Sequence, residues 1–361
     1  TEAEFAARER RDPEANAYFA RKGSMSASGI FRAWPGQHTD AHLTNAEFST
    51  VMQRLYGQKL TILTNLVGNR VGRSTNTVDE YGRSLTGASL PGATDQKRHN
   101  AVLHALHNSL RAYGIQAELE PTRIFLPLLT EPDKVYKAGI TPDGRADMDT
   151  PKEWLFDVKV VGDTWSRSSR SSRAPTETQR AVNVRQRDVH NHYPRTATKL
   201  DRAQGHGDNT IPGGPAATPD AWYQRPENWG PIRKRLADFK LMGPVAGPRG
   251  EISKDFVHLL RQAAKIGAIR VGQDVPVSAD TTAEAILRWH AMCRIGLVAQ
   301  RASARHIIDR LAYAMPGGAY HERTDAAREA TFGTGDPSDI VDNYRLARYA
   351  DGGASDGSHS W

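Results

Sequence analysis

Three charged residues on two neighbouring predicted strands have the types and spacing needed for metal-assisted chemistry. Asp157 and Lys159 lie in the segment LFDVKVV, and Asp147 lies shortly before them in the segment RADMD. Residues two apart on a strand point to the same face, so the Asp157 and Lys159 side chains share one face. A hairpin between the two strands would bring the Asp147 carboxylate beside them.

Two carboxylates and an ammonium group on one face are suited to hydrolysis of a phosphodiester. Carboxylate oxygens bind Mg²⁺, which keeps several of its waters. The metal lowers the pKa of a bound water, and a lysine can orient this water or offset developing negative charge. We therefore expect Asp147 and Asp157 to bind Mg²⁺ and to form a catalytic set with Lys159. Asp143 is a rival for the place of Asp147, which we prefer because Asp143 lies in a turn before the strand.

The predicted elements around these residues follow the order helix, strand, strand, strand, helix, strand. Val102, Leu103, Leu106 and Leu110 give the first helix a buried stripe, and Gly114 is a suitable C-cap. Pro194 is expected to break the second helix, with a separate short helix over 196–202. The expected bounds are a helix over 96–113, strands at 115–120, 145–149 and 154–161, a helix over 177–192 and a strand at 241–245.

Two further helices are predicted on either side of this region. Thr44 and Glu47 have the spacing of a capping box at the start of one helix, and Thr281 and Glu284 have it at the start of the other. The later helix has an apolar face that includes Ile286, Cys293, Leu297, Ala304, Ile307, Ile308 and Leu311. Its polar face is expected to carry Arg288, Arg294, Arg301, Arg305 and Arg310.

This arrangement resembles the PD-(D/E)XK restriction-endonuclease-like nucleases. The resemblance implies an α/β fold with an αβββαβ core, in which a mixed sheet is flanked by helices. Asp147 matches the first acid of the motif, with Ala146 in place of the usual proline, and Asp157 and Lys159 match the second acid and the lysine.

A broader resemblance covers roughly residues 24–315. The segments LTNAEFSTVMQRLYG, VDEYGRSLTGAS, KRHNAVLHALHNSLRAYGIQAELEP and GPVAGPRGEISKDFVHLL are similar to the region downstream of the reverse transcriptase in eukaryotic non-LTR-type retroelements. That region usually carries a Cys/His zinc site, but residues 68–88 contain neither residue, so no zinc is expected. His99, His104 and His107 stand on the first helix, where many such nucleases carry a glutamate.

The resemblance divides the chain into five parts. An irregular tail follows the last helix, and the nuclease-like core carries an insertion over 203–230. The expected parts are an N-terminal extension (1–43), a helix with a degenerate former zinc-site region (44–95), the PD-(D/E)XK-like core (96–250), a helical region (251–315) and the tail (316–361).

Composition favours nucleic acid as the partner. The 361 residues carry a formal net charge of +7, and the pI is about 9.5, so the chain attracts polyanions. Hydrophobic residues make up 38% and the mean hydropathy is -0.60, which is enough for a folded core and offers no apolar run for a membrane span. The single cysteine, Cys293, excludes an intramolecular disulfide. We expect a soluble intracellular protein, nuclear or organellar (mitochondrial) rather than secreted.

Candidate phosphate-binding residues follow the strand that bears Lys159. The segment WSRSSRSSR is a basic loop, which could grip the nucleic-acid backbone or remain a solvated loop. Gln186 and Arg187 are candidates on the following helix. The loop contributes Arg167, Arg170 and Arg173.

Two functions of different classes remain open on the sequence. The first is a Mg²⁺-dependent endonuclease, or a nucleic-acid-binding protein derived from one. The second is a catalytically silent structural subunit with protein and RNA neighbours in a large assembly such as a mitochondrial ribosome. The missing zinc ligands, the missing polymerase and the long extensions favour the second, whereas retention of Asp147, Asp157 and Lys159 favours the first. A viral capsid or packaging component is a third hypothesis.

Overall fold

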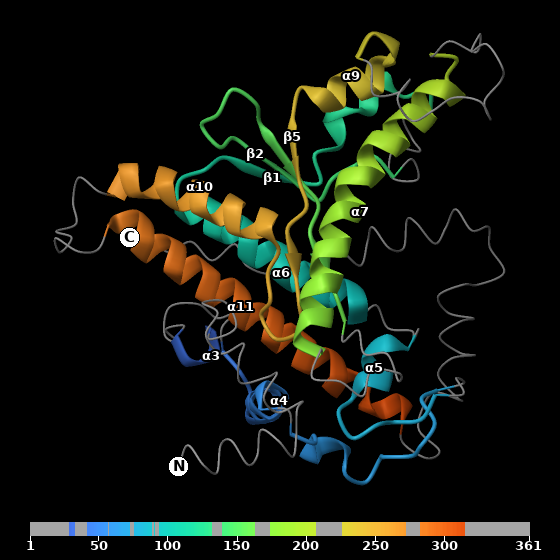
Figure 1. The fold of residues 1–361 in the computed structure, drawn as a ribbon, viewed down its shortest axis with the longest axis vertical. Coiled ribbons are helices and arrows are strands. Elements are labelled where there is room, and N and C mark those ends of the chain that lie inside the picture. The colour runs from blue at the N-terminus through green and yellow to red at the C-terminus, as the bar shows by residue number, and fades with distance from the viewer. Residues whose placement is uncertain are drawn as a thin grey trace, which may run out of the picture.

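The computed structural model gives a mixed α/β fold, in which a small mixed sheet is flanked by helices and followed by a helical C-terminal region (Figure 1). This class agrees with the α/β prediction. The structure describes residues 29–32, 42–56, 58–72, 76–88, 90, 94–131, 139–162, 174–206, 226–271 and 282–314.

The central sheet has the strand order β1-β2-β3-β5. The β1–β2 and β2–β3 pairs are antiparallel, and β3 and β5 are parallel. A second parallel pair, β4–β6, follows directly along the chain. The strands are β1 (Ala117–Leu119), β2 (Gly144–Ala146), β3 (Trp154–Phe156), β4 (Lys159–Val160), β5 (Lys240–Met242) and β6 (Val245–Ala246).

The two parallel pairs form one ribbon. The Asp157 N–H donates to the Met242 carbonyl at 3.1 Å, and the Lys159 N–H donates to the Pro244 carbonyl at 3.0 Å. These bonds bridge the gap between the β3–β5 and β4–β6 pairs. The backbone N–H groups of both Asp157 and Lys159 are therefore bonded to the β5–β6 segment, which fixes the directions of the two side chains.

Helices cover both faces of the sheet because the buried strand alternates its side chains. Trp154 and Phe156 belong to the core shared with α6 (Thr94–Ala112), α10 (Lys254–Val271) and α11 (Ala283–Asp309). Leu155 belongs to the core shared with α7 (Ala174–Ala203) and α9 (Pro231–Ala237). Figure 1 shows α7 crossing the molecule on the opposite side of the strands from α10 and α11. No helix in the described ranges is long and apolar enough to cross a membrane.

Three shorter helices precede the sheet, and all three contact α11. They are α3 (Gly29–Arg32), α4 (Asn45–Leu55) and α5 (Arg83–Gly87). The predicted capping box at α4 is confirmed, since the Glu47 carboxylate accepts from the Thr44 N–H at 2.8 Å and the Thr44 hydroxyl accepts from the Glu47 N–H at 3.2 Å. Short 3₁₀ helices lie at Thr61–Leu63, Thr122–Ile124, Leu126–Leu128, Pro226–Asn228 and Leu311–Tyr313.

Three sequence predictions about helices are wrong. α7 continues through Pro194, because Tyr193 and Ala197 are buried on either side and hold the helix against the core. The cap of α11 is Thr282, whose hydroxyl accepts from the Ala285 N–H at 3.2 Å. Ile286, expected on the apolar face, is 38% exposed.

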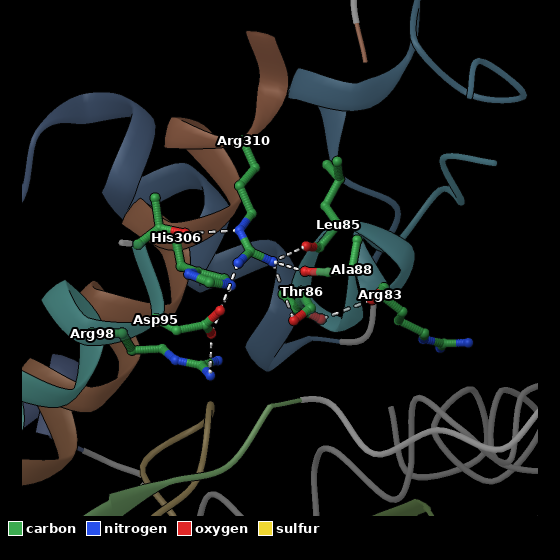
Figure 2. Close-up of polar contacts among 9 residues, drawn as sticks. Arg83, Leu85, Thr86, Ala88, Asp95, Arg98, His306 and Arg310 are labelled. Atoms are coloured by element: carbon green, nitrogen blue, oxygen red, sulfur yellow. Dashed lines mark hydrogen bonds and ion pairs between the residues drawn. The ribbon is translucent and has the colours of Figure 1, made fainter. Parts of the chain in front are cut away.

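Arg310, expected on the polar face of the last helix, is fully buried. Its guanidinium points at the C-terminal end of α5 and contacts several backbone carbonyls there (Figure 2). Nη2 also contacts the Asp95 carboxylate at 2.8 Å. The other partners are the carbonyls of Leu85 (2.5 Å), Ala88 (2.9 Å) and Thr86 (3.4 Å) and the hydroxyl of Thr94 (2.9 Å).

Candidate functional site

The register between β2 and β3 decides which acid meets Asp157. Gly144 pairs with Phe156 in this antiparallel ladder. One step further along the ladder, Asp143 comes level with Asp157, and the two carboxyl groups are close enough for each to affect the pKa of the other. Asp143, the rival candidate, therefore occupies the place that we expected for Asp147.

Asp147 lies at the far end of the same hairpin. Ala146 pairs with Trp154, so the next step sets Asp147 level with Glu153 rather than with Asp157. The Asp147 side chain is exposed, and it accepts a hydrogen bond from the Asp149 N–H at 3.1 Å. The structure does not bring Asp147 together with Asp157 and Lys159, because an antiparallel pair brings the start of one strand to the end of the other.

Asp157 and Lys159 lie together, as their spacing indicates. Lys159 Nζ is 2.7 Å from Asp157 Oδ2. The Asp157 side chain is 8% exposed, whereas that of Lys159 is 45% exposed. The carboxylate is thus enclosed, and the ammonium group extends from it toward solvent.

Asp143 is held by two further groups. Its Oδ2 accepts from the Val158 N–H at 2.7 Å, and its Oδ1 lies 3.4 Å from His99 Nε2. His99 reaches Asp143 from α6, where the resemblance leads one to expect a glutamate. Asp143 is therefore bound to both the ribbon and the first helix of the core.

The environments of the two acids push their pKa values apart. Burial alone would raise the pKa of Asp143, but the hydrogen bond and charge of His99, with the charge of Lys159, leave it below its usual value. Burial and the nearby Asp143 carboxylate raise the pKa of Asp157 to about 6. Near neutral pH the pair therefore has one carboxylate that is firmly ionised and one that exchanges a proton readily.

The two acids and Lys159 line an open pocket of about 590 Å³. One wall comes from the strands and the turn before β2, and the other comes from α7. The pocket lining comprises Glu120, Gly139, Thr141, Pro142, Asp143, Asp157, Lys159, Val160, Arg185, Asp188, Val189, His192 and Tyr193. A substrate can thus reach the carboxyl pair from solvent.

The α7 wall contributes residues that the sequence analysis did not place at the site. Tyr193 is buried, and its hydroxyl donates to the Thr141 carbonyl at 3.3 Å. Burial, together with the Asp157 and Asp143 carboxylates, raises the pKa of Tyr193 far above its usual value, so the phenol stays protonated. His192 Nε2 lies 2.9 Å from the Gly139 carbonyl. The spacing of the α7 residues by three and four was the signal that could have found this wall.

The predicted nucleic-acid-binding residues lie in different environments. Gln186 Nε2 donates to Asp255 Oδ1 at 2.8 Å, and this bond joins α7 to α10. Arg187 is exposed but does not line the pocket. The loop arginines, Arg167, Arg170 and Arg173, lie outside the described residues.

The carboxyl pair is the group that could hold a metal ion. Among the residues that the structure describes, no set of three or more His, Cys, Asp or Glu side chains is arranged to bind one. Mg²⁺, however, commonly binds through one or two carboxylates and keeps several waters. Asp143 and Asp157 fit this mode, since a cation would relieve the repulsion that raises the pKa of Asp157.

Comparisons with family models, with curated proteins and with solved structures found no match to this chain. The class of the fold therefore rests on its own geometry, which is mixed α/β with the carboxyl pair at the junction of the β3–β4 ribbon and α7.

Proposed function

We propose that this protein is a Mg²⁺-dependent nuclease of the PD-(D/E)XK type, with Asp143, Asp157 and Lys159 as its site. The observation that carries the proposal is the carboxyl pair in an open pocket, with Lys159 Nζ 2.7 Å from one of its oxygens. Pro142 precedes Asp143, so the segment reads Pro-Asp, followed by Asp-x-Lys on the next strand. With Asp143 as the first acid of the motif, the preceding residue is the usual proline, whereas Asp147 is preceded by Ala146.

The order of elements supports the same proposal. α6, β1, β2, β3, α7 and β5 occur in the order αβββαβ, with β4 inserted before α7 and α9 inserted before β5. The first acid directly precedes β2, and the second acid directly follows β3. Both positions face the pocket, where a phosphodiester can approach from solvent.

Each residue has a distinct role in this proposal. Asp143, held ionised by His99 and the Val158 N–H, supplies fixed negative charge. Asp157 supplies the second carboxylate, and a bound cation would relieve its repulsion with Asp143. The half-exposed Lys159 offsets negative charge on a phosphate oxygen. Bound Mg²⁺ would lower the pKa of a bound water and neutralise part of the charge on the phosphate.

The test is cleavage of supercoiled plasmid and of single-stranded RNA by the purified protein with Mg²⁺ or Mn²⁺. Asp143→Asn and Asp157→Asn should each lower the rate on the order of 100-fold or more, because each removes a charge at the reacting centre. Asp147→Asn is the matched control, being the same substitution at an exposed site on the same hairpin, and should cut at the parental rate.

Two results would overturn the proposal. One is cleavage that persists at the parental rate in Asp157→Asn. The other is no cleavage of either substrate with either metal, which would favour a structural nucleic-acid-binding role. If Asp147→Asn stops cutting and Asp143→Asn does not, Asp147 and not Asp143 is the first acid of the motif.

A further inference from the structure

An exposed stripe of side chains runs along α7 away from the pocket. Its members are spaced alternately by three and four residues, and all are exposed. A helix turns about 100° per residue, so this spacing keeps the six side chains on one side of α7. The stripe consists of Arg185, Asp188, His192, Arg195, Lys199 and Arg202.

The stripe begins at the site. Arg185, Asp188 and His192 line the pocket that holds the carboxyl pair. The three later members continue from there toward the C-terminal end of the helix. From Arg185 to Arg202 the helix rises about 25 Å. Along the axis of a DNA duplex each strand has one phosphate per about 3.4 Å, so this length spans about seven phosphates of one duplex strand.

The charge of the stripe is positive. Four of its members are arginine or lysine, and its one acid, Asp188, is paired with Arg185 at 3.2 Å. A second acid near this end, Asp201, is buried and accepts hydrogen bonds from the Ile232 and Arg233 N–H groups of α9. Asp201 therefore caps a neighbouring helix rather than opposing the exposed charges.

We propose that this stripe binds the sugar-phosphate backbone of a nucleic-acid strand, which runs from the pocket along α7 toward Arg202. The direction rests on the proposed nuclease function, because the reacting phosphate is taken to lie at the carboxyl pair. The inference moves the nucleic-acid contacts of α7 from Arg187, which lies off the stripe, to Arg195, Lys199 and Arg202.

The experiment compares two double variants that remove the same charge from the same helix. Arg195→Gln/Lys199→Gln alters the stripe, and Arg180→Gln/Arg187→Gln alters two exposed positions of α7 that lie off the stripe. Binding of a fluorescein-labelled single-stranded DNA is measured by anisotropy at several salt concentrations, without divalent cation. An RNA of the same sequence is measured in parallel.

The stripe variant should lower the slope of log K against log salt by about 1.4, since each phosphate contact on a single strand contributes about 0.7. The control pair should change the slope far less. DNA and RNA should rank the variants in the same order, because the contacts are to phosphates. Thermal unfolding followed by circular dichroism should be the same for the three proteins.

Equal losses in both double variants would show attraction to net charge alone and would overturn the stripe. Unchanged binding in the stripe variant would overturn it as well. Because no cleavage is involved, a protein that binds along the stripe but fails to cut would refute the nuclease and leave the binding surface standing.

Discussion

Asp143 and Asp157 are identical side chains in one pocket, yet their neighbours lower the pKa of the first and raise the pKa of the second. Asp143 accepts a backbone N–H and contacts His99, and both contacts favour its ionised form. Asp157 is enclosed beside Asp143, which favours its protonated form despite the contact with Lys159. The pKa of Asp157 is therefore raised while that of Asp143 is lowered, so Asp157 takes up a proton more readily as the pH falls.

The raised pKa of Asp157 predicts how stability depends on pH. The folded protein holds this proton up to about pH 6, whereas an ordinary aspartate loses it near 3.8. The folded state therefore binds more protons between these values, and it loses stability as the pH rises through about 6. Asp157→Asn should be more stable than the parent at pH 8 by about 1–3 kcal/mol, and this gain should shrink toward pH 4.

Urea denaturation in EDTA at pH 4.5 and pH 8 measures this effect. Asp143→Asn serves as the comparison, because its pKa is lowered and its carboxylate accepts the Val158 N–H. That variant should lose stability at pH 8. A larger destabilisation of Asp157→Asn at pH 8 than at pH 4.5 would contradict the assignment of the proton to Asp157.

The sequence was sufficient to pair Asp157 with Lys159 but not to choose between Asp143 and Asp147. The first inference needs only the two-residue period of a strand, which is a local property. The second needs the register of two strands, and a shift along the ladder changes every partner. The register here sets Gly144 against Phe156, and a side chain at position 144 would collide with the Phe156 ring.

At the scale of elements, α7 forms one wall of the site and is tied to the ribbon through α10. Asp255, in the first turn of α10, accepts from the Gly243 N–H at 2.7 Å and contacts His190 Nε2 at 2.6 Å. Gly243 lies between the β5 and β6 segments that pair with Asp157 and Lys159. The position of α7 is therefore coupled to the backbone that carries the two reacting side chains.

This tie should weaken as the pH rises. The hydrogen bond to Asp255 raises the pKa of His190 above its usual value, against the opposing effect of burial. The protonated imidazole thus stabilises the folded state below about pH 6.5, and this contribution is lost as the pH rises through the raised pKa. His190→Gln should lower the urea midpoint at pH 5.5 more than at pH 9.

His190 is 40% exposed, so the effect should be below about 1 kcal/mol. The same substitution in an Asp255→Asn background tests the cause. In this background the loss of stability caused by His190→Gln should be the same at pH 5.5 and pH 9, because the carboxylate that raises the pKa of His190 is gone. A difference in urea midpoint between the parent and His190→Gln that grows with rising pH would contradict the proposed stabilisation by protonated His190.

The continuity of α7 also shows where propensity fails as a guide. Proline removes one helical hydrogen bond and costs roughly 3 kcal/mol in a helix interior, so a break at Pro194 was the local expectation. Tyr193 and Ala197 are both buried against the core that contains Leu155. This packing depends on residues far away in the sequence, and it outweighs the local cost.

For the whole molecule, Arg310 joins segments from opposite ends of the described chain. Its guanidinium has no exposed surface and contacts three carbonyls and the Asp95 carboxylate. Arginine suits this place because its planar fork satisfies several acceptors at once. The sequence suggested a solvated side chain, because helical spacing cannot reveal acceptors more than 200 positions away.

Removing this side chain should destabilise the fold strongly. Arg310→Ala leaves the Leu85, Thr86 and Ala88 carbonyls without this donor, whereas Asp95 keeps its contact with Arg98. Because each unsatisfied buried acceptor costs about 1–3 kcal/mol, we expect a loss of about 3–5 kcal/mol in urea denaturation. Arg310→Lys should recover only part of this loss, since one ammonium group cannot reach all the acceptors. Arg305→Ala is the control on the same helix, because Arg305 is 56% exposed and paired with Asp309. Its second neighbour, Glu47, keeps Arg301, so this variant should cost less than about 1 kcal/mol. Equal effects at the two positions would contradict the proposed importance of the buried contacts.

The Arg310 contacts also affect the timing of folding during synthesis. The end of α5 and Asp95 of α6 receive a donor from Arg310, which lies 215 positions after Asp95. At ribosomal rates of about 5–20 residues per second, roughly 10–40 s pass between the synthesis of these two residues. During that interval the guanidinium that contacts these carbonyls in the folded protein does not yet exist, so the end of α5 reaches its final packing only after the last helix has been made.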